Sequence, residues 1–289
     1  MQLFNEILND YTDYCHQKLL CEFGSYDSSQ YDSVYLYQRY KCRIIDVRPR
    51  QVLEPPILLI SPAYASAYQK IVDDITNGEP LKKYQSRNLK KLDYDDDMLS
   101  HWNIQHFHLG ETIESDGFIK RSGDLLFIHF TETKAHIIGI FGHGAWCDLD
   151  IIEIMHGNWP DELSEFKTER TSQSLSEEEI KNLRKNNVNS TVTVQDSTEY
   201  INPGIGVTSN GAPLWATLNT QRVIAMFDNA FHAITQNITH ILSSDPEERE
   251  SEKATVGMEI DDTSKNIIYQ IKETGFKFTL QSDCGVMHL

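Results

Sequence analysis

The sequence lacks the features that mark secreted, disulfide-stabilised and membrane-spanning proteins. Its 289 residues include five cysteines, an odd number without any C-x-x-C pair, which indicates reduced thiols rather than a disulfide framework. The opening residues, MQLFNEILNDY, show no basic region followed by an apolar run, so they predict no secretion signal. The most apolar stretch, PPILLISPAYASAY, is interrupted and shorter than the roughly 20 residues of a membrane span. We therefore expect a cytoplasmic protein that inserts into no membrane.

Positive charge is also scarce. The formal net charge of −17 at pH 7 argues against a protein that coats nucleic acid through a diffuse positive field. Basic residues nevertheless gather at 39–50 and 82–91, which we call the first and second basic islands. We predict that they bind a nucleic-acid backbone through Arg39, Lys41, Arg43, Lys82, Lys83, Arg87, Lys90 and Lys91. The alternative is that both islands are solvated faces of an acidic protein.

Hydrophobic periodicity predicts a mixture of helices and strands. Apolar residues recur at three- and four-residue spacing over 3–23 and over 213–243, which predicts an amphipathic helix in each range. Residues 34–47 are rich in aromatic and β-branched side chains, so an extended segment is expected there. A helix ending at Asn77-Gly78 and a short helix in the second basic island follow. Residues 255–280 predict a terminal hairpin.

Most of the chain's eleven histidines lie between residues 101 and 160, so any chemistry is expected there. Residues 104–109 alternate, which places His106 and His108 on one face of a strand and Phe107 on the other. Residues 124–131 and 135–141 predict a hairpin beside this strand, giving three adjacent antiparallel strands. The third strand runs into Gly142-His143-Gly144, so a pocket at its end could collect all three histidines.

Three interpretations of this cluster stay open. His106 and His108 can reach one metal ion from alternate positions of a strand, with His143 as a third ligand. Without a metal, the same imidazoles can act as acids and bases near neutral pH, while the Arg121 guanidinium stabilises a phosphoryl transition state. In the third interpretation the imidazoles are hydrogen-bonded structural groups at a sheet edge.

Residues 50–146 contain, in order, a predicted helix, a basic helix, Arg121, the strand LLFIHF and the strand AHIIGIFGH. This order of elements resembles the RelE/ParE-type toxin fold. In the RelE branch of this family, basic and acid/base side chains on the sheet cleave messenger RNA without a metal. The resemblance implies such roles for Arg121, the basic islands and the histidines. The chain departs from the family in its length and in its acidity. The segment DDMLSHWNIQHFHLG also resembles a pattern of uncharacterised bacterial proteins.

These observations predict an α+β protein with a RelE-like antiparallel sheet of three to five strands and a C-terminal extension with one long helix and a β-hairpin. We expect a helix-plus-sheet core at 1–160, a polar linker or lid at 161–187 and the extension at 188–289. The predicted function is that of a metal-independent endoribonuclease of toxin or phage-defence type without cofactor, with His106, His108, Arg121 and His143 as catalytic residues. The expected partners are RNA, a neutralising antitoxin protein and a second copy bound through residues 213–243. The alternatives are a metal-dependent hydrolase and a non-catalytic protein that self-associates.

Overall fold

The computed structural model describes residues 1–169, 173–245, 252–282 and 285–286, in two compact units. The first unit combines Met1–Gln38 with Ala216–Leu289, and the second is Arg39–Trp215. This division differs from the predicted boundaries. The reason is that β1 (Gln2–Asn5) pairs in parallel with β9 (Lys253–Ile260), a contact across most of the chain that no local sequence pattern reveals.

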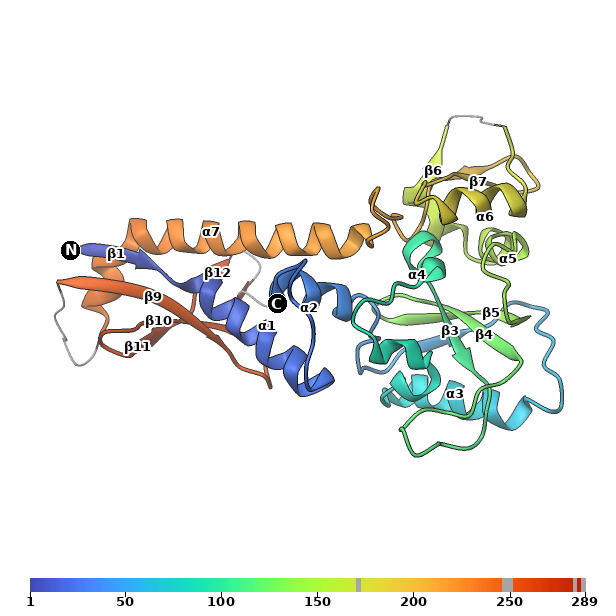
Figure 1. Cartoon of the computed structure of the whole chain (residues 1–289), viewed down its shortest axis with the longest axis horizontal. Coiled ribbons are helices and arrows are strands. Elements are labelled where there is room, and N and C mark those ends of the chain that lie inside the picture. The colour runs from blue at the N-terminus through green and yellow to red at the C-terminus, as the bar shows by residue number, and fades with distance from the viewer. Residues whose placement is uncertain (170–172, 246–251, 283–284, 287–289) are drawn as a thin grey trace. The chain divides into compact units, whose positions relative to one another are not determined.

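The first unit is a mixed sheet with two helices on one face (Figure 1). Its strand order is β1-β9-β10-β11, and β10 (Ile267–Ile271) pairs antiparallel with both β9 and β11 (Phe276–Phe278). Apolar residues of α1 (Ile7–Phe23) and α7 (Leu214–Ser243) share one buried cluster with alternate residues of β9 and β10, so both helices cover the same face. Two further short strands, β12 (Gln281–Ser282) and β13 (Gly285–Val286), pair antiparallel with each other.

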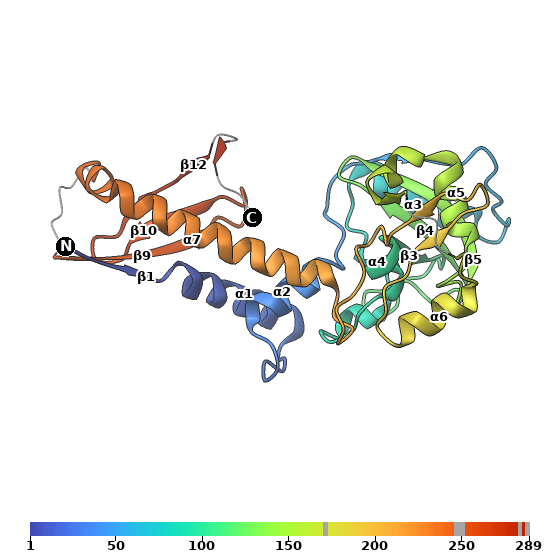
Figure 2. The ribbon, with the colours of Figure 1, turned by 90° about the horizontal axis from the view of Figure 1, so that it is seen from above.

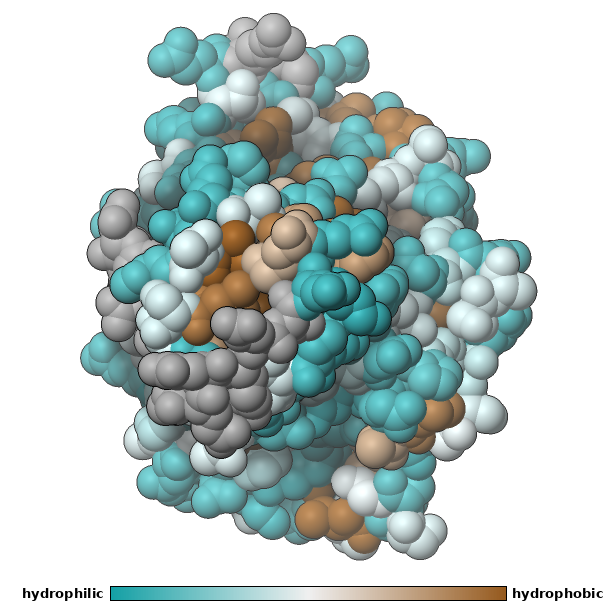
Figure 3. Space-filling model, turned by 90° about the vertical axis from the view of Figure 1, so that its left-hand side faces the viewer, coloured by the Kyte–Doolittle hydropathy of each residue, from teal (hydrophilic) through white to brown (hydrophobic). Residues whose placement is uncertain are grey.

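The apolar residues of α7 pack within the first unit. Phe227 and Ile234 are fully buried, and Val223, Phe231, Ile238 and Ile241 pack against the same cluster. The residues from which we expected a dimer interface are therefore largely covered by the chain's own sheet. Part of the surface of this unit still carries a brown apolar patch among hydrophilic residues (Figure 3), and β1 exposes Met1 and Phe4.

The second unit is built on a sheet with the order β2-β5-β4-β3. The predicted three adjacent antiparallel strands are confirmed as β3 (Ile104–His108), β4 (Asp124–Phe130) and β5 (Lys134–Gly142). The fourth strand, β2 (Gln51–Leu53), is parallel to β5 and was not expected, because prolines flank it closely in the sequence. β3 is thus an edge strand of the sheet.

Helices cover both faces of this sheet, with α3 (Ala65–Asn77) on one face and α4 (Asp97–Trp102), α5 (Asp150–Asn158) and α6 (Glu177–Lys185) on the other (Figure 1; Figure 2 gives the view from above). Alternate side chains of β4 point to opposite faces of the sheet. Leu125 and Phe127 pack in a cluster with α4, α5 and α6, whereas Leu126 and Ile128 pack in a cluster with α3. The unit also contains three short 3₁₀ helices in its described residues, η1 (Lys82–Tyr84), η2 (Arg87–Lys90) and η3 (Pro160–Phe166). A small second sheet comprises β6 (Lys167–Thr168), β7 (Val192–Thr193) and β8 (Glu199–Tyr200).

Two segments differ from the prediction. The expected extended segment at 34–47 begins as the helix α2 (Ser33–Lys41), where burial of Val34 and Leu36 outweighs the strand preference of the residues around them. The expected linker at 161–187 is part of the second unit, since Leu163 and Ile180 are buried in its core; residues 170–172 lie outside the described residues. Among the described residues, no helix is long and apolar enough to cross a membrane.

Candidate active site

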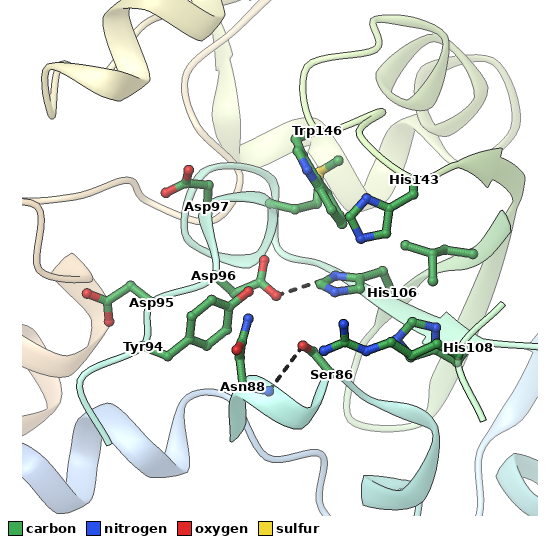
Figure 4. Close-up of a pocket in the computed structure, with 13 residues that line it drawn as sticks. Ser86, Asn88, Tyr94, Asp95, Asp96, Asp97, His106, His108, His143 and Trp146 are labelled. Atoms are coloured by element: carbon green, nitrogen blue, oxygen red, sulfur yellow. Dashed lines mark hydrogen bonds and ion pairs between the residues drawn. The ribbon is translucent and has the colours of Figure 1, made fainter. Parts of the chain in front are cut away.

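A cavity of about 370 Å³ lies on the face of the second unit's sheet that carries His106 and His108 (Figure 4). Its wall includes all four side chains that the sequence nominated for catalysis, His106, His108, Arg121 and His143. The half-buried indole of Trp146 also lines it. The opposite wall, which we call the acidic wall, is formed by Ser86, Asn88, Tyr94, Asp95, Asp96 and Asp97. Met98 and Leu125 also line the cavity.

The strand register explains how the two imidazoles reach the cavity. His106 pairs with Phe127 and His108 with Leu125 across the β3–β4 ladder, so both side chains project from one face. Phe107 projects from the other face and is fully buried. The predicted strand and its orientation are therefore confirmed. Both histidines are themselves largely enclosed, with exposed fractions of 6 and 5 %, and the cavity is their access to solvent.

Asp96 faces His106 across the cavity. Its Oδ2 lies 3.4 Å from Nδ1 of His106, and the two side chains are 10 and 7 % exposed. The other carboxylate oxygen of Asp96, Oδ1, accepts a hydrogen bond from the backbone N–H of Leu99 and thereby caps α4. A carboxylate fixed in this way favours the His106 tautomer with its proton on Nδ1, which leaves Nε2 able to accept a proton.

His108 is a neutral imidazole. Burial, followed by the neighbouring charges of His106 and Arg121, lowers the pKa of His108 to about 4. The backbone N–H of Ser122 donates to Nδ1 of His108 at 3.4 Å. Because Nδ1 accepts this bond, the ring proton is on Nε2, which is then a hydrogen-bond donor at neutral pH.

Trp146 lies between two of the histidines. Its ring centre is 4.8 Å from that of His106 and 5.5 Å from that of His143, with edge-to-face geometry in both pairs. His143 directly follows the end of β5, as predicted, and its side chain is exposed. It is therefore the most accessible of the three imidazoles.

Comparisons with protein-family models, with curated proteins and with solved structures give no match. The residues of the cavity are therefore interpreted from their chemistry. Among the described residues, no group of three or more histidine, cysteine, aspartate or glutamate side chains is arranged to hold a metal ion.

Sequence reasoning missed the acidic wall of the cavity. The run Asp95-Asp96-Asp97 was not among the predicted site residues; it begins α4, with Asp96 as the N-cap. The usable signal was the closeness of this run to the histidine strand, because a two-turn helix followed at once by β3 brings its start near that strand. Asp95 is already engaged: both of its oxygens accept hydrogen bonds from the Arg39 guanidinium, at 2.8 and 2.6 Å.

The basic islands do not form one exposed cationic surface. Arg39 and Arg43 are buried, with exposed fractions of 8 and 3 %, so neither faces solvent as binding to a nucleic-acid backbone would require. Lys83 pairs with Asp74 at 2.7 Å, and Arg87 pairs with Glu114 and Asp116. Lys90 also pairs with Asp116, and Lys82 donates to the Tyr40 hydroxyl. Lys41, Lys90 and Lys91 are the exposed members of the predicted set.

Arg43 fixes the segment that leads into the acidic wall. Its guanidinium donates to the backbone carbonyls of Lys91 and Tyr94, at 3.0 and 2.7 Å. Replacing Arg43 by methionine keeps an apolar stem but leaves these carbonyls unpaired, so we expect the free energy of unfolding to fall by about 2–3 kcal/mol. The exposed Lys91→Met is the matched control and should change stability by less than about 0.5 kcal/mol. Urea denaturation measures both, and equal effects would show that Arg43 has no such role.

Proposed function

We propose that the protein is a metal-independent endoribonuclease. The observation that carries the proposal is the shared cavity of His106, His108, His143 and Arg121, which brings three imidazoles and a guanidinium together in one solvent-accessible pocket. Imidazoles titrate near neutral pH and can move protons, while a guanidinium stabilises charge on a phosphoryl group. We further propose a RelE-like core at residues 50–146 and a role in bacterial stress or phage defence, with an antitoxin protein as partner.

Each side chain has a role in this proposal. His106, oriented by Asp96, accepts the proton of the ribose 2′-hydroxyl at Nε2, and the 2′-oxygen forms a bond to phosphorus. The bond from phosphorus to the 5′-oxygen breaks, and protonated His143 donates its proton to that leaving oxygen. His108 and Arg121 donate hydrogen bonds to the non-bridging phosphate oxygens as their charge grows. The products are a 2′,3′-cyclic phosphate and a 5′-hydroxyl. This step consumes no water molecule, and all of its proton transfers are assigned to side chains of the protein.

Binding of the RNA backbone is assigned to the exposed Lys90 and Lys91. They lie at and beside the end of η2, whose Asn88 lines the cavity. Lysines at this place attract the phosphates next to the one being cleaved. This local attraction offsets the repulsion between the RNA and the negative net charge of the protein.

The test is cleavage of a labelled mixed-sequence RNA in the presence of a chelator. We expect fragments with 2′,3′-cyclic phosphate ends, and no cleavage of the same sequence made with 2′-deoxyribose, because it lacks the nucleophile. The double variant His106→Ala/His108→Ala should lose activity by at least about 100-fold. The matched control His232→Ala/His240→Ala removes two exposed histidines of α7 and should keep the rate of the unmodified protein.

Two results would contradict the proposal. Cleavage of the deoxyribose substrate would exclude attack by the 2′-hydroxyl. Activity that disappears with chelator and returns with a divalent cation would favour the metal-dependent hydrolase instead.

A further inference from the structure

A second cavity, of about 360 Å³, lies within the second unit. It is bounded by residues 42–50, which join α2 to β2, by Leu99 and Asn103 at the end of α4, by Gln105 of β3 and by the turn between β4 and β5. It shares no lining residue with the candidate active site. Its volume falls within the range of roughly 300–1,000 Å³ that is usual for small-ligand sites.

The guanidinium of Arg50 is held firmly in the wall of this second cavity. Arg50 is 6 % exposed, and its Nε donates to the backbone carbonyl of Thr131 at 2.9 Å. Its Nη1 donates to the backbone carbonyl of Asp46, also at 2.9 Å. The central carbon of the guanidinium lies 5.4 Å from the centre of the Phe130 ring. These contacts fix the orientation of the guanidinium, but all of them are with neutral groups.

The positive charge of Arg50 makes no ion pair among the described residues. The two carboxylates of the cavity wall, Asp46 and Glu132, are exposed and pair with Arg48, at 3.4 and 2.7 Å. Burial, followed by the charge of Arg48, lowers the pKa of the Arg50 guanidinium. A buried charge is normally balanced by a counter-ion, so an anionic ligand would complete this wall.

Two hydrogen-bond donors are available to such a ligand. Nη2 of Arg50 makes no hydrogen bond within the described part of the chain, and it is not among the nitrogens that are sealed from solvent without a partner. Since Arg50 lines the cavity, we infer that Nη2 reaches solvent there. Asn103 also lines the cavity and is half-buried. Its side-chain amide likewise makes no hydrogen bond to any residue that the structure describes.

These donors suit a carboxylate better than a phosphate. Nε and Nη1 of Arg50 are already bound to carbonyls, so the guanidinium cannot grip a phosphate with two adjacent nitrogens. The charges of Asp46 and Glu132 in the same wall would also repel a dianion more strongly than a monoanion. A carboxylate carries one negative charge, and two donors are enough to hold its two oxygens.

The rest of the wall is suited to the apolar body of such an acid. Its hydrophobic members are Ile44, Ile45, Leu99 and Phe130. Apolar surface of a ligand that is buried against these side chains is removed from water, which favours binding. We propose that this cavity binds a small monocarboxylic acid with an apolar body, and that its carboxylate accepts hydrogen bonds from Arg50 and Asn103.

An NMR titration of the whole protein with hexanoate at pH 7 tests this proposal. Hexanoate should bind at least about tenfold more tightly than the neutral hexanamide, because hydrogen bonds to a charged group are strong. It should also bind more tightly than inorganic phosphate. The backbone amide signals of Asn103 and Thr131 should shift on binding, whereas those of His108 and His143 in the candidate active site should not.

Two variants remove the carboxylate site in different ways. Asn103→Asp keeps the shape of the side chain and tolerates the left-handed backbone at φ 57°, but its negative charge should weaken hexanoate binding at least about tenfold. Arg50→Met removes the cation and should have a similar effect. Because Arg50→Met also leaves two carbonyls unpaired, its folding is checked by circular dichroism, and Asn103→Asp decides alone if it does not fold. The control Lys70→Gln removes an exposed charge of α3 outside the cavity and should keep the affinity.

Several results would overturn the proposal. Absence of hexanoate binding, or equal affinity for hexanoate and hexanamide, would show that Arg50 holds no carboxylate. Tighter binding of phosphate would contradict the choice of ligand. Signal shifts centred on His108 and His143, or an affinity that survives in Asn103→Asp, would place the ligand elsewhere.

Discussion

Replacing Phe107 by alanine is expected to lower the free energy of unfolding by about 3–5 kcal/mol. The Phe107 side chain is fully buried, and its ring lies 5.7 Å from that of Tyr84 and 5.8 Å from that of Phe130. Truncation removes this apolar contact and leaves a cavity between the sheet and α3. The surrounding side chains are closely packed and cannot shift enough to fill this cavity. Urea denaturation followed by far-ultraviolet circular dichroism measures the change.

The neighbouring His106→Ala is the control for this experiment. It lies one position away on the same strand, but its side chain borders the cavity instead of the α3 cluster. We expect it to cost clearly less stability than Phe107→Ala. Equal losses for the two variants would contradict the assignment of the two strand faces to a core and a site.

Lowering the pH from 7 to 5 is expected to destabilise the protein by on the order of 3 kcal/mol through two histidines alone. Burial lowers the pKa of His101 and of His108 to about 4, from an ordinary value near 6.5. Between these values the unfolded chain binds a proton at each histidine and the folded protein does not. Stability therefore falls as the pH falls through this window, and the loss is complete only below pH 4.

Two further histidines act in the same direction. Burial also lowers the pKa of His129 and of His136. The hydrogen bond from Arg87 lowers the pKa of Asp116 to about 2. The stability that the ionised Asp116 contributes is therefore lost only below about pH 4, outside the pH range in which the histidines act. Unfolding free energies measured at several pH values from 7 to 5 test this, and the slope should become shallower in His108→Gln. A stability that stays constant over this range would contradict the buried neutral state of these imidazoles.

The sequence was most informative where the structure depends on local periodicity. Alternation over residues 104–109 was enough to separate Phe107 from the two histidines, because side chains of a strand must alternate. The glycines around His143 placed it at the end of its strand, so the imidazole wall of the cavity could be anticipated. The end of α3 at Gly78, whose backbone is left-handed with φ 73°, followed equally from the preference of glycine for that conformation.

The features that could not be predicted depend on contacts between residues far apart in the sequence, which leave no local pattern. The acidic wall depends on how α4 turns back over β3, and the buried state of Arg39 and Arg43 depends on carbonyls and a carboxylate some 50 residues further along the chain. Runs of basic residues look the same in a sequence whether they face solvent or the protein's own acceptors. The helix α2 shows the same limit, since its buried contacts outweigh a local preference for strand.

The parallel pairing of β1 with β9 has a consequence for synthesis of the protein on the ribosome. The strand partner of β1 is translated about 250 residues later, which takes roughly 10–50 s at the usual rate of elongation. The second unit is complete in sequence before α7 and β9 have emerged, so it can fold first. During that interval the apolar side of α1, including Ile7, Tyr11 and Cys15, has no sheet to cover it. The nascent chain thus presents a hydrophobic helix that chaperones can bind until the last strands arrive.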